Sequence, residues 1–428
     1  MLERQKSRFN NYIMNKKDNI KASSNGGVSG PFINRNDYIL FIVFISVLGS
    51  FSSLVNDMYL PTIPAMMKEF HTTPSMTQLG ISATMLGLGI GSVLWGSLSD
   101  RFGRKRILMI SLVVFIIGTA VSMASKSIHF FILCRLFQGV GAGGSMVLSY
   151  SIPTDRYGGR QLAVIMSVVG ALNGFVPAAA PLAGGFMADE FGWRGIFLVL
   201  LAIGVIMLVW TTRRPESLPQ SRRLKSADIR SFLSAYGVLF RNGRFMLYVF
   251  AKSIAIGLLF SYISSAPFIV QTHYGLSAAH FGILIGANSL ALVIGSMLVS
   301  KLRSVKRSLL FGGAVMCCSA IAESVLLWID CGLIGYEIAI VPMLFGSGMV
   351  FSTSNALSME EGRSDAGSAS AILNVTKYIF AAVVIPLVGL GDIMRSTGIV
   401  FTVIALISGA LFIRICFLKP LSEMQKDE

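Results

Sequence analysis

The sequence predicts an all-α membrane protein whose chain crosses the bilayer many times. Hydrophobic residues make up 54% of the 428 residues, only 13% are charged, and the mean hydropathy is +0.69. The hydrophobic residues form many runs of about 20, the length that spans a bilayer as a helix. A soluble core does not need runs of this length, so the composition excludes an ordinary globular enzyme or binding domain.

Twelve membrane spans are expected where polar breaks separate the hydrophobic runs. They cover residues 38–62, 75–98, 107–125, 127–150, 161–187, 194–212, 244–271, 277–300, 308–329, 332–356, 366–390 and 396–418. The longest internal break divides them into two sets of six. The predicted parts are an N-terminal arm (1–36), a first six-helix bundle (37–212), a linker (213–243), a second six-helix bundle (244–418) and a tail (419–428).

The distribution of positive charge predicts how the chain is oriented. Most of the 36 Lys and Arg residues fall in the termini and in the alternate connections on the same side of the membrane. The positive-inside rule therefore places both termini in the cytosol. Within the linker, DIRSFLSAYGVLF (228–240) begins with a potential helix cap and has hydrophobic residues at helical spacing, which predicts a helix on the membrane surface.

Several functional classes are disfavoured by the same pattern. The net charge of +15 is spread among the connections rather than gathered on one soluble face, so nucleic acid is not an expected partner. Four of the five cysteines fall in hydrophobic runs and are expected to be buried free thiols, with neither metal nor disulfide. The four histidines lack ligand spacing and no catalytic triad is evident, so neither an enzyme nor a cofactor is predicted.

The segment GSLSDRFGRKRIL (96–108) concentrates charge between two hydrophobic runs. Its basic residues can orient the loop, but topology alone does not explain an Asp at the end of span 2 or the glycines. Gly103 fits a tight turn and Gly96 a close helix approach, while Asp100 can form charge-assisted hydrogen bonds with nearby arginines. We expect a conformational latch on the cytosolic side made of Gly96, Asp100, Arg101, Gly103, Arg104 and Lys105.

This segment resembles the loop 2–3 signature of the major facilitator superfamily, and the resemblance covers nearly the whole chain. NDMYLPTIP (56–64) and CRLFQGVGAGG (134–144) are similar to 12-helix drug/proton antiporters of the Bcr/CflA type and also to MdfA-type transporters. PAAAPLAGG (177–185) resembles their span 5 antiporter motif at Pro177, Pro181, Gly184 and Gly185. The MdfA type has a second acidic residue in span 1 where this chain has Gly49, so the Bcr/CflA group fits better.

The resemblance implies a major facilitator fold of two pseudo-symmetric six-helix bundles, with spans 1, 4, 7 and 10 lining a central cavity. The segment GSMLVSKLRSVKRSLLFGG (295–313) follows span 8 as 96–108 follows span 2, which agrees with internal repetition.

Charged residues inside the spans are costly and are therefore candidates for function. We expect Asp57 to bind the transported proton and Arg135 to tune its pKa. Alternatively, Asp57 only caps the break before Pro61 and Arg135 only bonds backbone carbonyls. Glu323 and Glu337 are expected to have local hydrogen-bonded roles rather than substrate contacts. The candidate cavity wall comprises Met58, Tyr59, Phe137, Met146, Lys252, Phe260, Tyr262, Phe268 and Lys377, each of which could instead serve packing.

The sequence thus predicts a proton-coupled antiporter of the bacterial inner membrane, multi-pass and functional as a monomer. It would export small amphipathic drugs, as in multidrug or phenicol efflux, by alternating access, using the proton gradient and no cofactor. Lys377 in the cavity would favour neutral, zwitterionic or anionic substrates over lipophilic cations. The alternatives are a proton-coupled importer or exporter of one metabolite on the same fold, and a non-transporting membrane sensor.

Overall fold

The computed structural model describes residues 35–223, 237–302, 304–363 and 366–417. All regular secondary structure in these ranges is helical, which confirms the predicted all-α class. Nearly all of the N-terminal arm (1–36), the tail (419–428) and most of the predicted surface helix (228–240) lie outside the described residues.

The described helices fall into two halves. The first half contains α2 (Arg35–Asp57), η1 (Leu60–Thr62), α3 (Ile63–Glu69), α4 (Pro74–Phe102), α5 (Arg104–Met123), α6 (Ile128–Arg156) and α7 (Gly159–Thr212). The second half contains α9 (Gly243–Pro267), η3 (Phe268–His273), α10 (Ala278–Leu298), η4 (Val299–Lys301), α11 (Val305–Ile329), α12 (Gly332–Glu361), α13 (Ala366–Val384), η6 (Ile385–Gly389) and α14 (Ile393–Cys416). Each predicted span overlaps one of these helices, or a helix and its short continuation, along nearly its whole length.

Eleven of the described helical segments are long and apolar enough to cross a membrane. One of them, α7, holds two of the predicted spans, because its 54 residues would be about 80 Å long as a single straight helix. Its backbone breaks at Gly192, which has φ 60° and ψ −171°. Non-glycine residues are excluded from this conformation, so Gly192 separates spans 5 and 6 without an intervening loop. The twelve predicted spans are therefore present.

Local sequence signals set most of the helix boundaries. The side chains of Thr73, Ser277 and Ser304 each accept a hydrogen bond from a backbone N–H in the first turn of α4, α10 and α11. Asn242 and Asp392 do the same for α9 and α14. These caps satisfy N–H groups that have no partner within the helix, which stabilises helix starts near the membrane surface.

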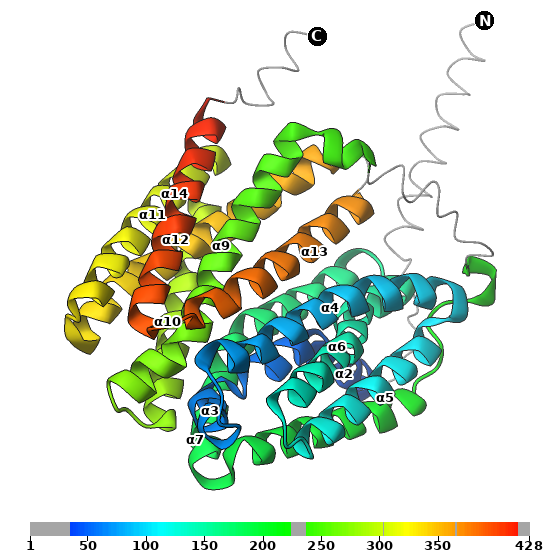
Figure 1. Ribbon diagram of the computed structural model, residues 1–428. Coiled ribbons are helices and arrows are strands. Elements are labelled where there is room, and N and C mark those ends of the chain that lie inside the picture. The colour runs from blue at the N-terminus through cyan, green and yellow to red at the C-terminus, as the bar shows by residue number, and fades with distance from the viewer. Residues whose placement is uncertain (1–34, 224–236, 303, 364–365, 418–428) are drawn as a thin grey trace, which may run out of the picture.

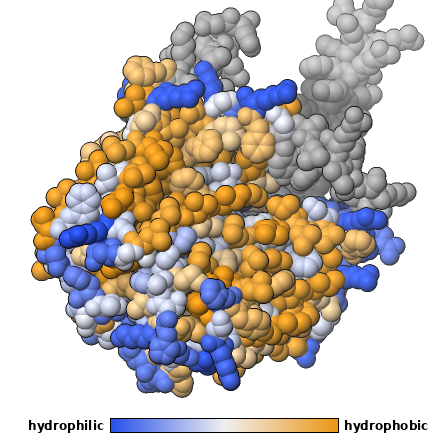
Figure 2. Space-filling view, viewed as in Figure 1, coloured by the Kyte–Doolittle hydropathy of each residue, from blue (hydrophilic) through white to orange (hydrophobic). Residues whose placement is uncertain are grey.

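The two halves lie side by side, with α10 of the second half against α7 of the first and α13 against α4 (Figure 1). The end of the molecule that carries Arg35 and Cys416 is called here the terminal end, and the opposite end, which carries Glu69 and Ile329, the distal end. Hydrophobic residues cover most of the visible face, and hydrophilic residues gather toward its edges (Figure 2). This distribution fits a protein whose sides contact lipid.

Glycine allows α4 and α6 to approach closely along their length. A Cβ atom on Gly87 or Gly91 would collide with the α6 backbone near Val140, and one on Gly139 would collide with Thr84 of α4. Van der Waals packing of this kind holds helices together in a membrane, where lipid removes most of the hydrophobic driving force.

We predict that Gly91→Ala lowers the stability of the first half, because the added methyl group has no room beside the Val140 carbonyl. The expected cost is about 1–3 kcal/mol, typical of overpacking. The matched control is Gly170→Ala, since a methyl group added at Gly170 would meet nothing within 4 Å. Thermal unfolding of the two purified variants in detergent checks the prediction; equal melting temperatures would contradict it.

Candidate functional site

An ionic network occupies the terminal end of the first half. Arg104 lies within 2.7 Å of Asp100 and 2.9 Å of Asp155, which is at the end of α6. The Arg104 side chain is 10% exposed and that of Asp155 13%, whereas the Asp100 side chain is 42% exposed. The better-buried partner of Arg104 is therefore Asp155, a residue outside the predicted latch.

Glu216, just beyond the end of α7, ties the linker to the same network. Its carboxylate accepts hydrogen bonds from the backbone N–H groups of Arg104, Ser217 and Leu218, at 2.9, 2.9 and 3.1 Å. Lys105 donates to the carbonyl of Thr212 at 2.7 Å. The start of the linker is thus held against α5 by charge-assisted hydrogen bonds.

The glycines of the motif differ in their roles. Gly103 has φ 98° and joins α4 to α5, with no room for a side chain beside Glu216, so the turn requires glycine. At Gly96 the nearest neighbour of an added Cβ would be Val147 at 3.6 Å, an ordinary contact. The close helix approach expected at Gly96 is therefore not present in this conformation.

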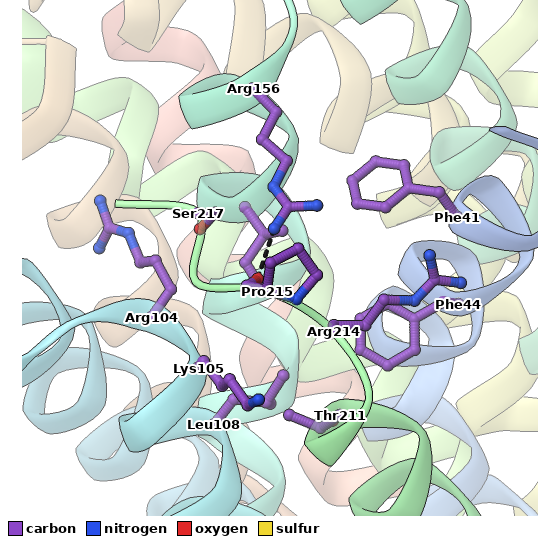
Figure 3. Close-up of a pocket in the computed structure, with 11 residues that line it drawn as sticks. Phe41, Phe44, Arg104, Lys105, Leu108, Arg156, Thr211, Arg214, Pro215 and Ser217 are labelled. Atoms are coloured by element: carbon purple, nitrogen blue, oxygen red, sulfur yellow. Dashed lines mark hydrogen bonds between the residues drawn. The ribbon is translucent and has the colours of Figure 1, made fainter. Parts of the chain in front are cut away.

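The described partners of the motif all belong to the first half or to the start of the linker. Arg101 lies over the ring of its neighbour Phe102, 5.2 Å from the centroid. Beside the network is a small pocket where Arg104, Lys105, Arg156 and Arg214 surround Pro215, whose carbonyl accepts a hydrogen bond from Arg156 (Figure 3). The role of these residues as a conformational latch on the cytosolic side stays a prediction.

Sequence reasoning missed Asp155 and Glu216, although one signal was available. The stretch DRYGGR (155–160) repeats the DRFGR pattern of the loop between α4 and α5, at the same terminal end. For Glu216 no comparable pattern exists, because its partners are backbone groups.

Arg135 is fully buried inside the first half. Its guanidinium donates to the side chain of Gln138 and to the carbonyl of Val55 at 3.3 Å, and it lies 4.2 Å from the centroid of the Tyr59 ring. It forms no ion pair with Asp57 among the described residues. The tuning of the Asp57 pKa by Arg135 stays a prediction, and in this conformation Tyr59 is fully buried against Arg135 rather than lining a cavity.

Asp57 is the last residue of α2 and is 8% exposed. It shares one face of that helix with Ser46, Ser50 and Ser53, at spacings of three and four residues. Ser50 donates to the side chain of Asn173 on α7 at 3.4 Å, and Asn173 donates to Tyr150 of α6 at 2.9 Å. This polar face points away from the aromatic core around Phe51 and Phe115.

Lys252 and Lys377 extend this polar region into the second half. Lys252 donates to Asn355 of α12 at 2.7 Å and lies 5.0 Å from the centroid of Phe351. Lys377 lies over Tyr378 at 4.6 Å, close enough to Tyr150 for attraction and to Lys252 for repulsion. The structure therefore brings together polar groups from α2, α6, α7, α9, α12 and α13, and we call this set the central polar cluster: Ser50, Tyr150, Asn173, Lys252, Asn355 and Lys377.

Met146 and Phe137 of α6 have opposite outcomes. Met146 contacts the second half, since its sulfur accepts a hydrogen bond from Tyr378 at 3.0 Å. Phe137 is nine residues earlier, half a turn out of phase, and is 53% exposed on the same outer face as Leu133. The prediction that Phe137 lines the cavity is wrong, because it faces away from the second half.

The other predicted wall residues are mostly covered. Tyr262 and Phe268 are each 1% exposed, and the Tyr262 hydroxyl accepts a hydrogen bond from Asn288 at 2.9 Å inside the second half. Met58 is 5% exposed, and Phe260 is partly buried. In this conformation Tyr262, Phe268 and Met58 serve packing, which was the alternative interpretation for each.

The span 5 motif lies at the contact between the halves. A Cβ on Gly185 would collide with the backbone of Ala278 at the start of α10 in the second half, whereas one on Gly184 would collide with Met58 inside the first half. From the opposite side, Gly282 of α10 approaches the carbonyl of Pro181. Small residues on both helices therefore permit backbone contact between the halves.

Hydrogen bonds join the halves at the distal end. Gln78 donates to the carbonyl of Ser264 at 3.0 Å, and Ser75 donates to that of Pro386 at 3.0 Å. Gln271 donates to the carbonyl of Pro61 at 2.9 Å. These bonds and the α7–α10 contact hold the halves together at the distal end.

A family model described as Major Facilitator Superfamily matches residues 41–386. The chain belongs to the major facilitator superfamily. This membership confirms the family predicted from the motifs, and the fold of two six-helix halves agrees with it.

Curated members of the superfamily align along most of this chain. It is 32% identical over 356 residues to an uncharacterized MFS-type transporter YdgK of Bacillus subtilis, covering 81% of this chain and 88% of that protein. It is 25% identical over 373 residues to Multidrug resistance protein D of Escherichia coli, covering 86% and 92%. A Bicyclomycin resistance protein homolog of Haemophilus influenzae is 24% identical over 371 residues, covering 85% and 92%.

Solved superfamily structures share the fold at low sequence identity. A bacterial homolog of the human lysosomal transporter Spinster, in an inward-facing and unoccupied conformation, superposes with a TM-score of 0.73 at 13% identity, covering 89% of this chain and 97% of that one. The xylose transporter XylE from E. coli, in a partially occluded inward-open conformation, gives 0.67 at 16% identity, covering 90% and 99%.

We predict that Asp155→Asn destabilises this superfamily member more than Asp100→Asn does. Asp155 supports a nearly buried arginine, and losing that partner costs about 1–3 kcal/mol. The more exposed Asp100 should contribute less than about 1 kcal/mol. Melting temperatures of the two variants in detergent decide the order; a larger loss for Asp100→Asn would contradict it.

Proposed function

We propose that this protein is a proton-coupled antiporter that exports small amphipathic drugs by alternating access. The observation that carries the proposal is the central polar cluster between two halves that contact each other through small residues. Intramembrane charged and polar groups at the interface of two repeats are the usual place for substrate and coupling ion. The resistance proteins among the relatives support drugs as the substrates.

The orientation follows from charge. The terminal end carries Arg101, Arg104, Lys105, Arg156 and Arg214, and the positive-inside rule assigns such an end to the cytosol. With that assignment, the distal hydrogen bonds close the outer side. The protein would reside as a monomer in the bacterial inner membrane.

Asp57 is the proposed proton carrier. Its carboxyl group ends the polar face of α2, and no ion pair offsets its charge among the described residues, so the neutral, protonated form suits the closed distal end. Arg135 acts on this region indirectly, by bonding the Val55 carbonyl two residues before Asp57. The proton gradient supplies the energy and no cofactor takes part.

The two lysines define the substrate preference. Lys252 and Lys377 place positive charge in the central polar cluster, while Tyr378 and Phe351 supply aromatic surface beside it. We therefore propose neutral, zwitterionic or anionic amphipathic substrates, because a lipophilic cation would be repelled at close range.

We predict that Asp57→Asn abolishes export driven by a pH gradient while exchange of labelled drug down its own gradient continues. In the wild type, one proton that enters across 100 mV supplies about 2.3 kcal/mol for the export of a neutral drug. Loss of this coupling should therefore lower the drug concentration ratio that the protein can maintain by about 50-fold. Drug uptake into inverted vesicles across a range of pH provides the measurement.

The matched control for this experiment is Asp189→Asn, a carboxylate near the distal end. Proton-driven export that survives in Asp57→Asn would overturn the role of Asp57. A protein that moves no drug and no protons under any condition would instead favour the sensor alternative.

We further predict that Lys377→Met increases transport of ethidium relative to chloramphenicol by about tenfold, because one positive charge leaves the cluster. The control is Lys68→Met at the exposed distal surface. Competition between the two drugs in proteoliposomes tests the prediction, and an unchanged preference would remove the lysine from substrate selection.

A further inference from the structure

The second half contains two buried carboxyl groups that the proposed mechanism does not use. Glu323 of α11 is 0% exposed, and neither of its oxygens has a hydrogen-bond partner among the described residues. Glu337 of α12 is partly buried; its Oε2 accepts a hydrogen bond from Asn288 at 2.8 Å, and its Oε1 has no described partner. The local hydrogen-bonded role expected for Glu323 is therefore wrong, while Glu337 has such a bond.

The two carboxyl groups lie near each other and share their surroundings. Glu337 is close enough to Glu323 for electrostatic repulsion between ionised forms. Three tyrosines belong to these surroundings: Tyr262 shares Asn288 with Glu337, Tyr336 precedes Glu337 in α12, and Tyr274 donates a hydrogen bond to Asp330. Asp330 and Cys331, between α11 and α12, are the other titratable neighbours. No Lys or Arg forms an ion pair with either glutamate in the described part of the chain.

These surroundings favour a neutral pair. An ionised carboxylate without donors is very costly in a low-dielectric interior, and two adjacent carboxylates cannot both ionise there at moderate cost. The described residues hold no group of three or more His, Cys, Asp or Glu side chains suited to a metal ion. A proton is therefore the occupant that the chemistry fits.

Polar groups connect the pair with the distal surface. At that surface, Asp330 lies 3.0 Å from His273 and accepts a hydrogen bond of 3.4 Å from Tyr274. Between that surface and Glu337, Tyr336 has a buried hydroxyl group with no described partner. Glu337 also borders a groove on the surface of α12, lined by Leu333, Ile334, Ile338, Val341 and Pro342.

The pair is also linked to the contact between the halves. Asn288 donates to both Glu337 and the Tyr262 hydroxyl of α9. Two residues beyond Tyr262, the carbonyl of Ser264 accepts the hydrogen bond from Gln78 that joins the halves. A change of charge at Glu337 thus acts through one amide on the helix that closes the distal end.

We propose that Glu323 and Glu337 form a second proton-binding site, separate from Asp57 and reached from the distal side. Glu323, which lacks donors, holds the proton, and Glu337 exchanges it with the distal solvent. One carboxylate oxygen takes a proton from water and returns it, with no other bond changed. The use of this proton in transport rests on the proposed antiport function, whereas its binding does not.

Infrared difference spectroscopy tests the binding. The full-length protein in a maltoside detergent, which has no carbonyl group, should show a protonated carboxyl band at neutral pH. Glu323→Gln and Glu337→Gln should each remove part of this band, whereas the exposed control Glu190→Gln should leave it unchanged. A band unaffected by both variants, in samples with wild-type melting temperature, overturns the proposal.

Proton release on drug binding separates this proposal from the function of Asp57. A pH indicator should record fewer protons per bound chloramphenicol in Glu337→Gln than in the wild type or Glu190→Gln. If Glu337→Gln matches the wild type and Asp57→Asn releases none, the second site fails and the antiporter stands. If Asp57→Asn matches the wild type and Glu337→Gln does not, Asp57 fails and the second site stands.

Discussion

The cost of holding charge in a hydrocarbon environment governs where polar groups lie in this protein. The buried charge of Arg135 is stabilised by the Gln138 side chain, the Val55 carbonyl and the face of the Tyr59 ring, all within the first half. Lys252 is stabilised by a hydrogen bond to Asn355 of the second half. Glu323 has no such partner and can be accommodated only as a neutral acid. The same constraint thus produces a structural arginine, a hydrogen-bonded lysine and a protonated carboxyl group.

Close helix packing is the second requirement, and glycine supplies it in two different settings. Within the first half, the glycines of α4 and α6 fix a contact that need not change. Between the halves, Gly185 and Gly282 permit contact without interlocking side chains. Helix surfaces made of small residues can separate at a modest free-energy cost, because few side-chain contacts are lost. Glycines within one half therefore mark a permanent helix contact, and glycines between the halves mark a reversible one.

Much of the fold could be predicted because hydrophobic runs and turn residues are local signals. The twelve spans follow from run length, and the turn at Gly103 follows from a glycine between a charged helix end and a basic helix start. The residues of the candidate site were harder to predict, because which way a side chain points depends on the helix that packs beside it. Phe137 and Met146 lie on the same helix, and only the neighbouring helices decide which one faces the second half. Likewise, the partners of Arg104 and Arg135 come from distant segments.

The one-residue turn at Gly192 affects how the chain enters the membrane. Spans 5 and 6 have no loop between them that could wait in solvent while the first helix settles. They form a single helical hairpin, with Trp193 and Arg194 at its tip bonded to Glu69 beside span 1. The tip also offers no accessible strand for a protease or an inserted epitope. Through Glu69, the last hairpin of the first half is tied to the short helix that follows its first span.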